Sequence, residues 1–269
     1  MILKLTFDTI QSPVFNMAAD LFRLSICTDP DAVYLRLYSW SRPTVSLGYM
    51  QKAEDVLDLR ACEADGVGWI RRITGGRAVL HWNDLTYSVV FSHQNKAMGR
   101  TVAETYKIIS DCLIAGLSKA GIETSPHDSA LDTARARSET KLPCFLAPNR
   151  DELMVNGKKL IGSAQKRTNT AVLQHGSIPL TADFAQLARY SKNPPAHREA
   201  ELRLFRQKCT FVNEVNPGVL VSRLAESLAD GFKETLGVFA LKEPWSGESI
   251  SAIEALAGSS EFKTTYSGS

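Results

Sequence analysis

An arginine-rich segment that contains paired glycines lies between two apolar, strand-like stretches in the first third of the chain. It runs from Arg71 to His81 and includes Gly75-Gly76. Paired glycines let backbone N–H groups approach a ligand closely, and guanidinium groups can neutralise a phosphate or carboxylate or hold an acyl carbonyl. The spacing matches neither the Rossmann nor the P-loop glycine pattern, which excludes those nucleotide sites here. We interpret the segment as a binding site; a tight hairpin turn with solvated arginines is the alternative.

Several β-rich stretches are separated by turn residues, so a sheet built partly from hairpins is expected. The stretches 33–38 and 44–48 are joined by Ser-Arg-Pro and are expected to be neighbouring strands. Asn156-Gly157 predicts a type I′ turn between two further strands. The other expected strands are 69–72, 85–91, 152–155, 158–165 and 171–180.

Helical periodicity is clearest at 101–120, where Thr101 and Glu104 form a capping-box pattern and Gly121 ends the helix. Other helices are expected at about 16–25, 53–65 and 218–236. The sequence contains hairpins, and its strands precede the helices, with only one long crossover connection. This order favours an α/β (α+β) architecture over a doubly wound parallel sheet. The sequence therefore predicts a mixed, largely antiparallel sheet flanked by helices.

Length and composition limit the classes of protein that this chain can belong to. With 269 residues, 44% of them hydrophobic, the chain can bury a full core as one large domain, with or without a small appendage. A formal charge of +2 gives no reason to expect nucleic-acid binding. The apolar runs are too short to span a bilayer, and the first residues lack the features of a signal peptide. We therefore expect a cytoplasmic protein with neither nucleic acid nor membrane as a partner.

The five cysteines are scattered without a C-x-x-C pair, so we interpret them as reduced thiols. Cys112 lies within the 101–120 helix and Cys27 near the end of another, and both are expected to be small buried residues. Cys144 differs, because Pro143 and Pro148 flank it and preclude a regular helix. It is expected in a loop, where reactive groups are commonly displayed. The histidines, such as His127 and His197, have no metal-ligand spacing, and no metal is expected.

Several separate motifs, taken in order, resemble the lipoate-protein ligase and octanoyltransferase superfamily, whose catalytic fold is shared with biotin protein ligases. The similarity spans residues 15–180, with a weaker continuation to about 236. It implies a biotin/lipoate ligase-like catalytic domain over 1–240 and a C-terminal extension over 241–269, packed on or trailing the same domain. The motifs that carry the resemblance lie at 16–20, 42–51, 71–81, 143–145, 157–165 and 173–177.

The resemblance is greatest to the octanoyltransferases that use a cysteine. In that group, a cysteine upstream of a Gly-Lys-Lys hairpin is the nucleophile, which corresponds here to Cys144 and to Lys159 of the hairpin. The implied reaction moves octanoyl from acyl carrier protein onto Cys144 and then to a lysine of a lipoyl domain, such as the glycine-cleavage carrier protein. Lys159 would favour the thiolate or orient the acyl carbonyl. A solvated strand lysine is the alternative for Lys159.

The resemblance also implies a set of substrate-binding residues. His81 is among them although Trp82 follows it; ligases more often carry an aspartate there, and Trp82 departs from both the ligases and the transferases. His175 could shape the acyl pocket, assist proton transfer or be a hydrogen-bonded structural histidine. The arginines could meet acidic carrier proteins or a pantetheine phosphate, or be surface charges. The implied substrate-binding residues are Arg71, Arg72, Thr74, Gly75, Gly76, Arg77, His81, Gly162, Ser163, Ala164, His175 and Gly176.

Three other functions remain open. In a lipoate-protein ligase, ATP and magnesium would be required, Lys159 would contact the adenylate and Cys144 would be incidental. An amidotransferase would move octanoate between lipoyl domains with the same cysteine. A noncatalytic member would only bind acyl chains or a carrier domain. The transferase needs no cofactor, because transfer between thioesters is nearly thermoneutral and amide formation from a thioester is downhill.

Overall fold

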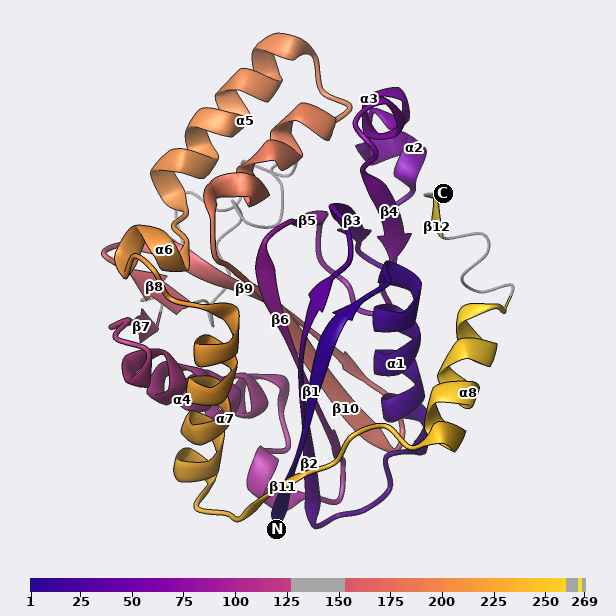
Figure 1. Cartoon of the computed structure of the whole chain (residues 1–269), viewed down its shortest axis with the longest axis vertical. Coiled ribbons are helices and arrows are strands. Elements are labelled where there is room, and N and C mark those ends of the chain that lie inside the picture. The colour runs from indigo at the N-terminus through magenta and orange to yellow at the C-terminus, as the bar shows by residue number, and fades with distance from the viewer. Residues whose placement is uncertain (127–152, 260–265, 268–269) are drawn as a thin grey trace.

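The computed structural model describes residues 1–126, 153–259 and 266–267, which form two sheets with helices around them (Figure 1). The strands are β1 (Ile2–Gln11), β2 (Ala32–Trp40), β3 (Thr44–Leu47), β4 (Gly68–Arg71), β5 (Val79–His81), β6 (Asp84–Ser92), β7 (Ser125–Pro126), β8 (Leu153–Val155), β9 (Lys158–Arg167), β10 (Ala171–Pro179), β11 (Ala240–Lys242) and β12 (Tyr266–Ser267). The helices are α1 (Pro13–Ile26), α2 (Ala53–Val56), α3 (Leu59–Ala64), α4 (Val102–Lys119), α5 (Pro195–Lys208), α6 (Val212–Val215), α7 (Val221–Leu236) and α8 (Gly247–Ala257), with 3-10 helices η1 (Lys96–Met98) and η4 (Ala182–Tyr190).

The larger sheet has eight strands in the order β11-β1-β2-β6-β10-β9-β8-β7. β1 lies parallel to β11 and β2, and the remaining neighbours are antiparallel. The predicted mixed, largely antiparallel sheet flanked by helices is therefore confirmed. The sequence interpretation does not include β1, although Leu3 and Leu5 are buried and alternate with the less buried Lys4, as in a strand with one apolar face.

The smaller sheet has the order β12-β4-β3-β5 and lies beyond the ends of β2 and β6. β3 pairs with β4 and β5, whereas β2 pairs with β1 and β6. The expectation that 33–38 and 44–48 are neighbouring strands is therefore wrong. Both edges of β2 are already hydrogen-bonded, so no edge is left for β3, and residues 41–43 lead the chain out of one sheet into the other.

Local sequence signals fix several element boundaries. Thr101 and Glu104 form a complete capping box at the start of α4. Asn156 and Gly157 both have positive φ, at 50° and 75°, as the predicted type I′ turn requires. The helix predicted at 53–65 is interrupted, because the chain is extended between α2 and α3 and Asp58 caps the second helix. Most of the loop predicted at 125–142 lies outside the described residues.

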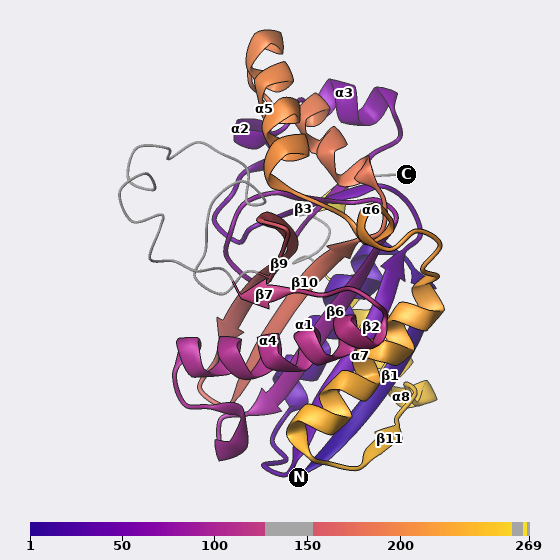
Figure 2. The ribbon, with the colours of Figure 1, turned by 90° about the vertical axis from the view of Figure 1, so that its left-hand side faces the viewer.

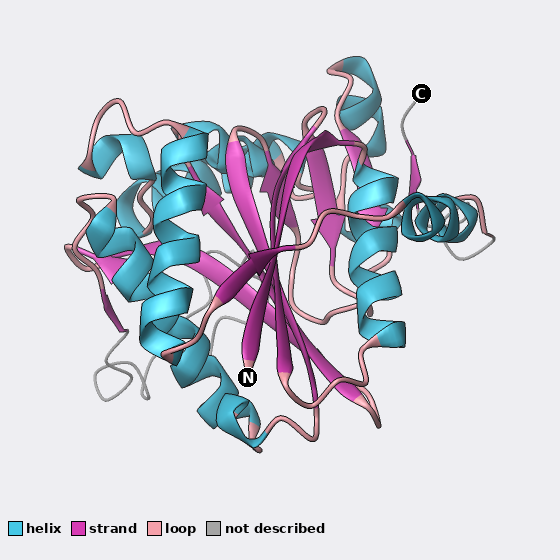
Figure 3. Cartoon of the chain, turned by 60° about the horizontal axis from the view of Figure 1, so that its bottom comes forward, coloured by secondary structure: helices cyan, strands magenta, loops and turns pink. Residues whose placement is uncertain are grey.

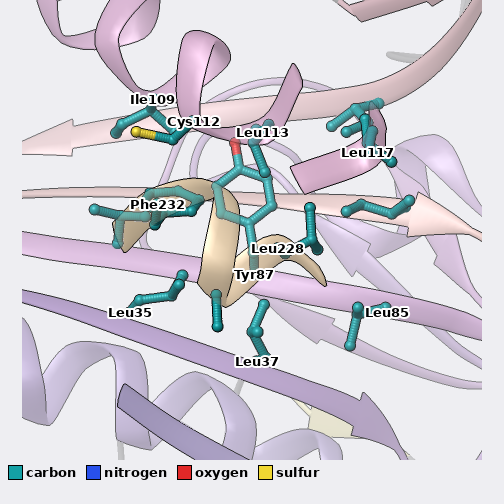
Figure 4. Packing of buried hydrophobic residues seen from close by; sticks show 14 of the residues in the cluster. Leu35, Leu37, Leu85, Tyr87, Ile109, Cys112, Leu113, Leu117, Leu228 and Phe232 are labelled. Carbon is teal, nitrogen blue, oxygen red and sulfur yellow. The ribbon is translucent and has the colours of Figure 1, made fainter. Parts of the chain in front are cut away.

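Helices α4 and α7 cover one face of the larger sheet (Figure 2). Tyr87 from β6 is fully buried beneath them, together with Leu113, Leu228 and Phe232 (Figure 4). The two helices touch at Gly116 and Gly231: a Cβ on Gly231 would lie 2.2 Å from the Gly116 nitrogen and 2.5 Å from its Cα. Only glycine permits this approach of the two backbones.

We therefore expect Gly231→Ala to destabilise the fold. The methyl group would collide with backbone rather than with a movable side chain, so α7 must shift, at a cost of about 3 kcal/mol despite the better helix propensity of alanine. Thermal unfolding measures the loss. Gly247→Ala, at the start of α8 where an added Cβ meets nothing within 4 Å, is the matched control. Equal midpoints for the two variants would contradict this account of the α4–α7 contact.

The opposite face of the larger sheet is covered by α1 (Figure 3). Ser12 caps its first turn and Pro13 begins it. α8 packs on the outer side of α1, where Ile253 is fully buried against Met17 and its neighbours. The division of the chain at residue 240 stays a prediction. In the parts of the chain that the structure describes, no helix combines the length and the apolar character needed to cross a bilayer.

Candidate functional site

A pocket lies between the two sheets, close to the first turn of α1. The small sheet contributes β3, β5 and the residue that follows β4; the large sheet contributes β2, β6, β9 and β10. Its walls therefore depend on residues that are more than a hundred positions apart in the sequence. The lining residues are Met17, Tyr38, Trp40, Ser46, Arg72, Val79, His81, Thr86, Lys159, Gly162, Ser163, Ala164, His175, Gly176 and Ser177.

Most of the predicted site residues meet at this pocket. Arg72, His81, Lys159, Gly162, Ser163, Ala164, His175 and Gly176 line it directly. Thr74, Gly75 and Gly76 lie in the segment that links β4 to β5, beside the pocket. Arg71 and Arg77 are half-buried and do not line it; the Arg71 Nε atom donates to the Gln51 carbonyl. Cys144 lies outside the described residues.

Arg72 holds the glycine-containing segment in shape. Its side chain is 5% exposed. Nε donates to Thr74 Oγ1, Nη1 to the carbonyl and hydroxyl oxygens of Ser46, and Nη2 to the carbonyls of Gly75 and Arg77. All five guanidinium N–H groups therefore have protein acceptors. This arrangement gives Arg72 a structural part in the pocket wall; direct binding of substrate by Arg72 stays a prediction.

The first histidine of the site belongs to a buried chain of hydrogen bonds. Thr74 Oγ1 lies 2.7 Å from His175 Nε2, and His175 Nδ1 lies 2.9 Å from Asp20 Oδ2. Since Thr74 Oγ1 accepts from Arg72, its hydroxyl proton is available to His175 Nε2. With a proton on Nδ1, His175 donates to Asp20 and can accept from Thr74 through Nε2. Residues 16–20 and 173–177, two of the motifs in the sequence, thus meet at Asp20 and His175.

The second histidine has the same arrangement. Ser46 Oγ lies 2.8 Å from His81 Nε2, and His81 Nδ1 lies 2.8 Å from Asp84 Oδ2. Ser46 Oγ also accepts from Arg72, so two hydroxyl–histidine–aspartate chains begin at one guanidinium group. Asp84 supplies the carboxylate that the sequence lacks at Trp82, a residue that packs against an apolar cluster instead. This geometry assigns His81 a fixed orientation, stacked 4.0 Å from the Trp40 ring.

Sequence reasoning did not identify Ser46, Asp20 or Asp84 as members of the site. Asp20 and Ser46 lie within motifs that carry the resemblance, at 16–20 and 42–51, and the signal at Asp20 is a carboxylate in a stretch that is otherwise apolar. Asp84 lies three residues beyond the 71–81 motif. Asp20 and Asp84 are nearly inaccessible to solvent, at 1% and 4% exposure. Burial alone would raise the pKa of Asp20, but the hydrogen bond from His175 and the positive charge around the carboxylate, that of Arg36 included, outweigh it and lower the pKa below its usual value. Asp20 is therefore a carboxylate at neutral pH.

Two glycines allow the site segments to approach one another. A Cβ on Gly48 would lie 1.9 Å from the Gly76 carbonyl oxygen. A Cβ on Gly176 would lie 2.6 Å from the Tyr87 ring and 2.7 Å from the Gly162 carbonyl oxygen. The absence of a side chain at Gly48 thus lets the Gly75-Gly76 loop pack against it, and the absence of one at Gly176 lets β9 and β6 pack closely on β10.

Lys159 enters the pocket from the start of β9. It is 5% exposed, so the alternative of a solvated strand lysine is not what the structure shows. Its backbone is fixed on both sides: Met154 of β8 is its register partner, and its carbonyl accepts from the Thr210 N–H at 2.9 Å. A buried primary amine at the wall of a pocket can stabilise a thiolate or a carbonyl oxygen that gains negative charge. Among the described residues, no group of three or more His, Cys, Asp or Glu side chains is arranged to hold a metal ion.

Lys159 and Arg72 thus line one pocket between the two sheets. Residues 12–233 match the family of lipoyl protein ligase A/B catalytic domains, and the chain belongs to this family. Octanoyltransferase LipM of Geobacillus kaustophilus is 37% identical over 252 residues, 91% of this chain and 90% of that protein. Octanoyltransferase LipM of Kyrpidia tusciae is 39% identical over 232 residues, 84% of each chain.

Similar solved structures share the fold. A bipartite lipoate protein ligase from Thermoplasma acidophilum, studied with its E2 lipoyl domain, has a TM-score of 0.78 and 22% identity, and the match covers 96% of this chain and 92% of that one. A lipoate-protein ligase A bound with ATP has a TM-score of 0.76 and 22% identity, with 96% and 94% covered. The family and the fold expected from the sequence are therefore confirmed.

Proposed function

We propose that this protein is an octanoyltransferase of lipoate synthesis that uses octanoyl-acyl carrier protein as donor and a lipoyl domain, such as the glycine-cleavage carrier protein, as acceptor. The observation that carries the proposal is the buried Lys159 at the pocket wall, in a family whose similar members include proteins named octanoyltransferase. No ATP and no metal are part of the proposed reaction. A cytoplasmic location belongs to the same proposal.

The reaction has two acyl transfers. The Cys144 thiolate attacks the donor thioester carbonyl, a new C–S bond forms, and the donor's thiolate leaves and takes up a proton. The acceptor's lysine amine then attacks the Cys144 thioester, an amide forms as the amine loses a proton, and the Cys144 thiolate is released. Lys159 favours the thiolate or holds the carbonyl oxygen in both transfers.

The other cysteines support the assignment of Cys144. Cys27, Cys62, Cys112 and Cys209 are buried, as predicted for the first and third, and none of them lines the pocket. Burial raises the pKa of Cys27 and Cys62 to about 11 and that of Cys112 to about 12, which makes them poor nucleophiles at neutral pH. Of the five cysteines in the sequence, Cys144 is the one that remains as a candidate nucleophile.

Intact-mass spectrometry tests the proposal. Wild-type protein is incubated with octanoyl-acyl carrier protein in the absence of ATP and is expected to gain one octanoyl group that hydroxylamine removes. Cys144→Ser is expected to lose this adduct. Cys209→Ser is the matched control, because Cys209 is the bridge partner of Lys159 in the backbone, and it should be labelled as the wild type is.

Other outcomes identify the other functions. Equal labelling of wild type and Cys144→Ser would remove Cys144 from the mechanism. Modification of a lipoyl domain only when ATP, magnesium and free octanoate are present would identify a ligase. Transfer only from an octanoylated lipoyl domain would identify an amidotransferase, and binding of acyl groups without turnover a noncatalytic protein.

A further inference from the structure

A third chain of hydrogen bonds, partly buried, reaches the pocket from the C-terminal part of the protein. The indole N–H of Trp245 donates to Asp8 Oδ2 at 3.1 Å, and the same oxygen accepts from Arg36 Nε. Arg36 Nη1 donates to Asp20 Oδ1 at 3.2 Å. Asp20 Oδ2 in turn accepts from His175 Nδ1, and His175 lines the pocket. Trp245 thus connects to the site through two carboxylates and one guanidinium group.

Arg36 is held rigidly at the centre of this chain. It is 5% exposed, and its Nη1 and Nη2 also donate to the backbone and side-chain oxygens of Asn16, in the first turn of α1. The guanidinium lies 3.9 Å from the centre of the Tyr38 ring. Tyr38 donates its hydroxyl to Asp20 Oδ2 and lines the pocket. A change in the position of Arg36 therefore moves Asp20, and through Asp20 the imidazole of His175.

The segment that carries Trp245 is firmly attached to the same region. Glu243 pairs with Lys4 at 3.0 Å and with Arg23 at 3.1 Å. The Arg23 guanidinium lies 4.7 Å from the centre of the Trp245 ring. α8 follows directly and packs on α1. All of these residues are either at the N-terminus of the chain, on α1, or beyond residue 233, where the match to the family ends.

We propose that Asp8 and Trp245 are positioning residues of the acyl-transfer site: they hold Arg36 so that Asp20 fixes the ring orientation and the Nδ1–H tautomer of His175. Trp245 of the C-terminal segment thereby acts on the pocket through Asp8 and Arg36. The effect on turnover rests on the proposed octanoyl transfer, whereas the effect on His175 does not.

Trp245→Phe is the decisive variant, because it removes the indole N–H and keeps an aromatic ring beside Phe22 and Arg23 of α1. We expect kcat for octanoyl transfer to fall about fivefold to tenfold with KM unchanged, since a small displacement of a pocket group acts on the reacting geometry more than on binding. Asp8→Asn, which keeps the size of the side chain and removes its charge, should act in the same direction. Glu243→Gln is the matched control: it breaks the ion pairs of the same segment without touching Asp8, and kcat should stay at the wild-type value.

Nitrogen-15 NMR of histidine-labelled protein reports directly which ring nitrogen of His175 carries the proton. The His175→Gln variant is used to assign its signals. The wild type and Glu243→Gln are expected to show the Nδ1–H tautomer, and Trp245→Phe and Asp8→Asn a larger fraction of the Nε2–H tautomer. A wild-type tautomer in both variants, or an equal loss of kcat in Glu243→Gln, would overturn the proposal. If the wild type fails to transfer octanoyl, the proposed function fails, and the tautomer measurement still decides the positioning role.

Discussion

Replacement of Lys159 by methionine is expected to lower kcat for octanoyl transfer by about 100- to 1,000-fold, the effect of removing one preorganised donor from a developing negative charge. Methionine keeps the length of the side chain and adds no polar group to a position that is 5% exposed, so the fold should be retained. Steady-state transfer from octanoyl-acyl carrier protein to an acceptor lipoyl domain gives kcat, and thermal unfolding shows whether the variant is intact.

Lys158→Met is the matched control for this change. Lys158 is the adjacent lysine, but its ammonium group pairs with Glu214 at 3.0 Å and it does not line the pocket. Its loss should leave kcat within about twofold of the wild type, since a partly exposed ion pair is worth only about 0–1 kcal/mol to the fold. Equal losses of activity in the two variants would mean that Lys159 has no special part in the reaction.

The rate of alkylation of Cys144 by iodoacetamide separates the two roles open to Lys159. If its ammonium favours the thiolate, Lys159→Met should slow alkylation near neutral pH, because the thiolate is the nucleophile. If Lys159 holds the acyl carbonyl, alkylation should proceed at the wild-type rate while kcat falls. The same variant therefore tests the contribution of Lys159 and its mechanism.

The parts of this fold that sequence reasoning predicted are those fixed by residues close together in the chain. Thr101 and Glu104 specify the start of α4, and Asn156-Gly157 specifies a turn, because each signal acts within one turn of backbone. The pairing of strands is different. Whether β3 lies beside β2 or β4 depends on which strand edges are already occupied, and β1, which takes one edge of β2, was not identified.

The site residues that were predicted likewise lie in local sequence motifs, whereas their hydrogen-bond partners were missed. The motif residues Lys159, His81 and His175 were identified from their sequence context, which the family resemblance supplied. Asp84 was missed although it is only 3 residues from His81, across the turn from β5 to β6. Ser46 and Asp20 were missed because Ser46 is 35 residues from His81 and Asp20 is 155 residues from His175. No periodicity links positions so far apart, and only the closure of the sheets brings them together. The resemblance located the pocket, whereas its hydrogen-bond chains required the structure.

The position of Arg72 in both chains makes it the residue whose replacement should affect the whole pocket. Its guanidinium reaches acceptors on Ser46, Thr74, Gly75 and Arg77 at once. A lysine keeps the charge, but its ammonium has three donors on one atom and cannot span the same set of oxygens. Arg72→Lys would therefore leave buried carbonyl or hydroxyl acceptors without donors, and it would free both hydroxyl–histidine pairs from their common support.

We expect Arg72→Lys to lower the free energy of unfolding by about 3 kcal/mol, since each buried polar group left unpaired costs about 1–3 kcal/mol. The melting temperature should fall by about 6–12 °C for a chain of this size, and kcat should fall by about 100-fold, because Thr74 and Ser46 no longer fix the two imidazoles. Arg71→Lys is the control, because Arg71 is half-buried outside the pocket and its Nε donates to the carbonyl of Gln51. Differential scanning calorimetry and the transfer assay measure both effects. If Arg72→Lys behaves as Arg71→Lys does, the buried guanidinium does not organise the site, and the two hydroxyl–histidine–aspartate chains must be maintained by the sheets alone.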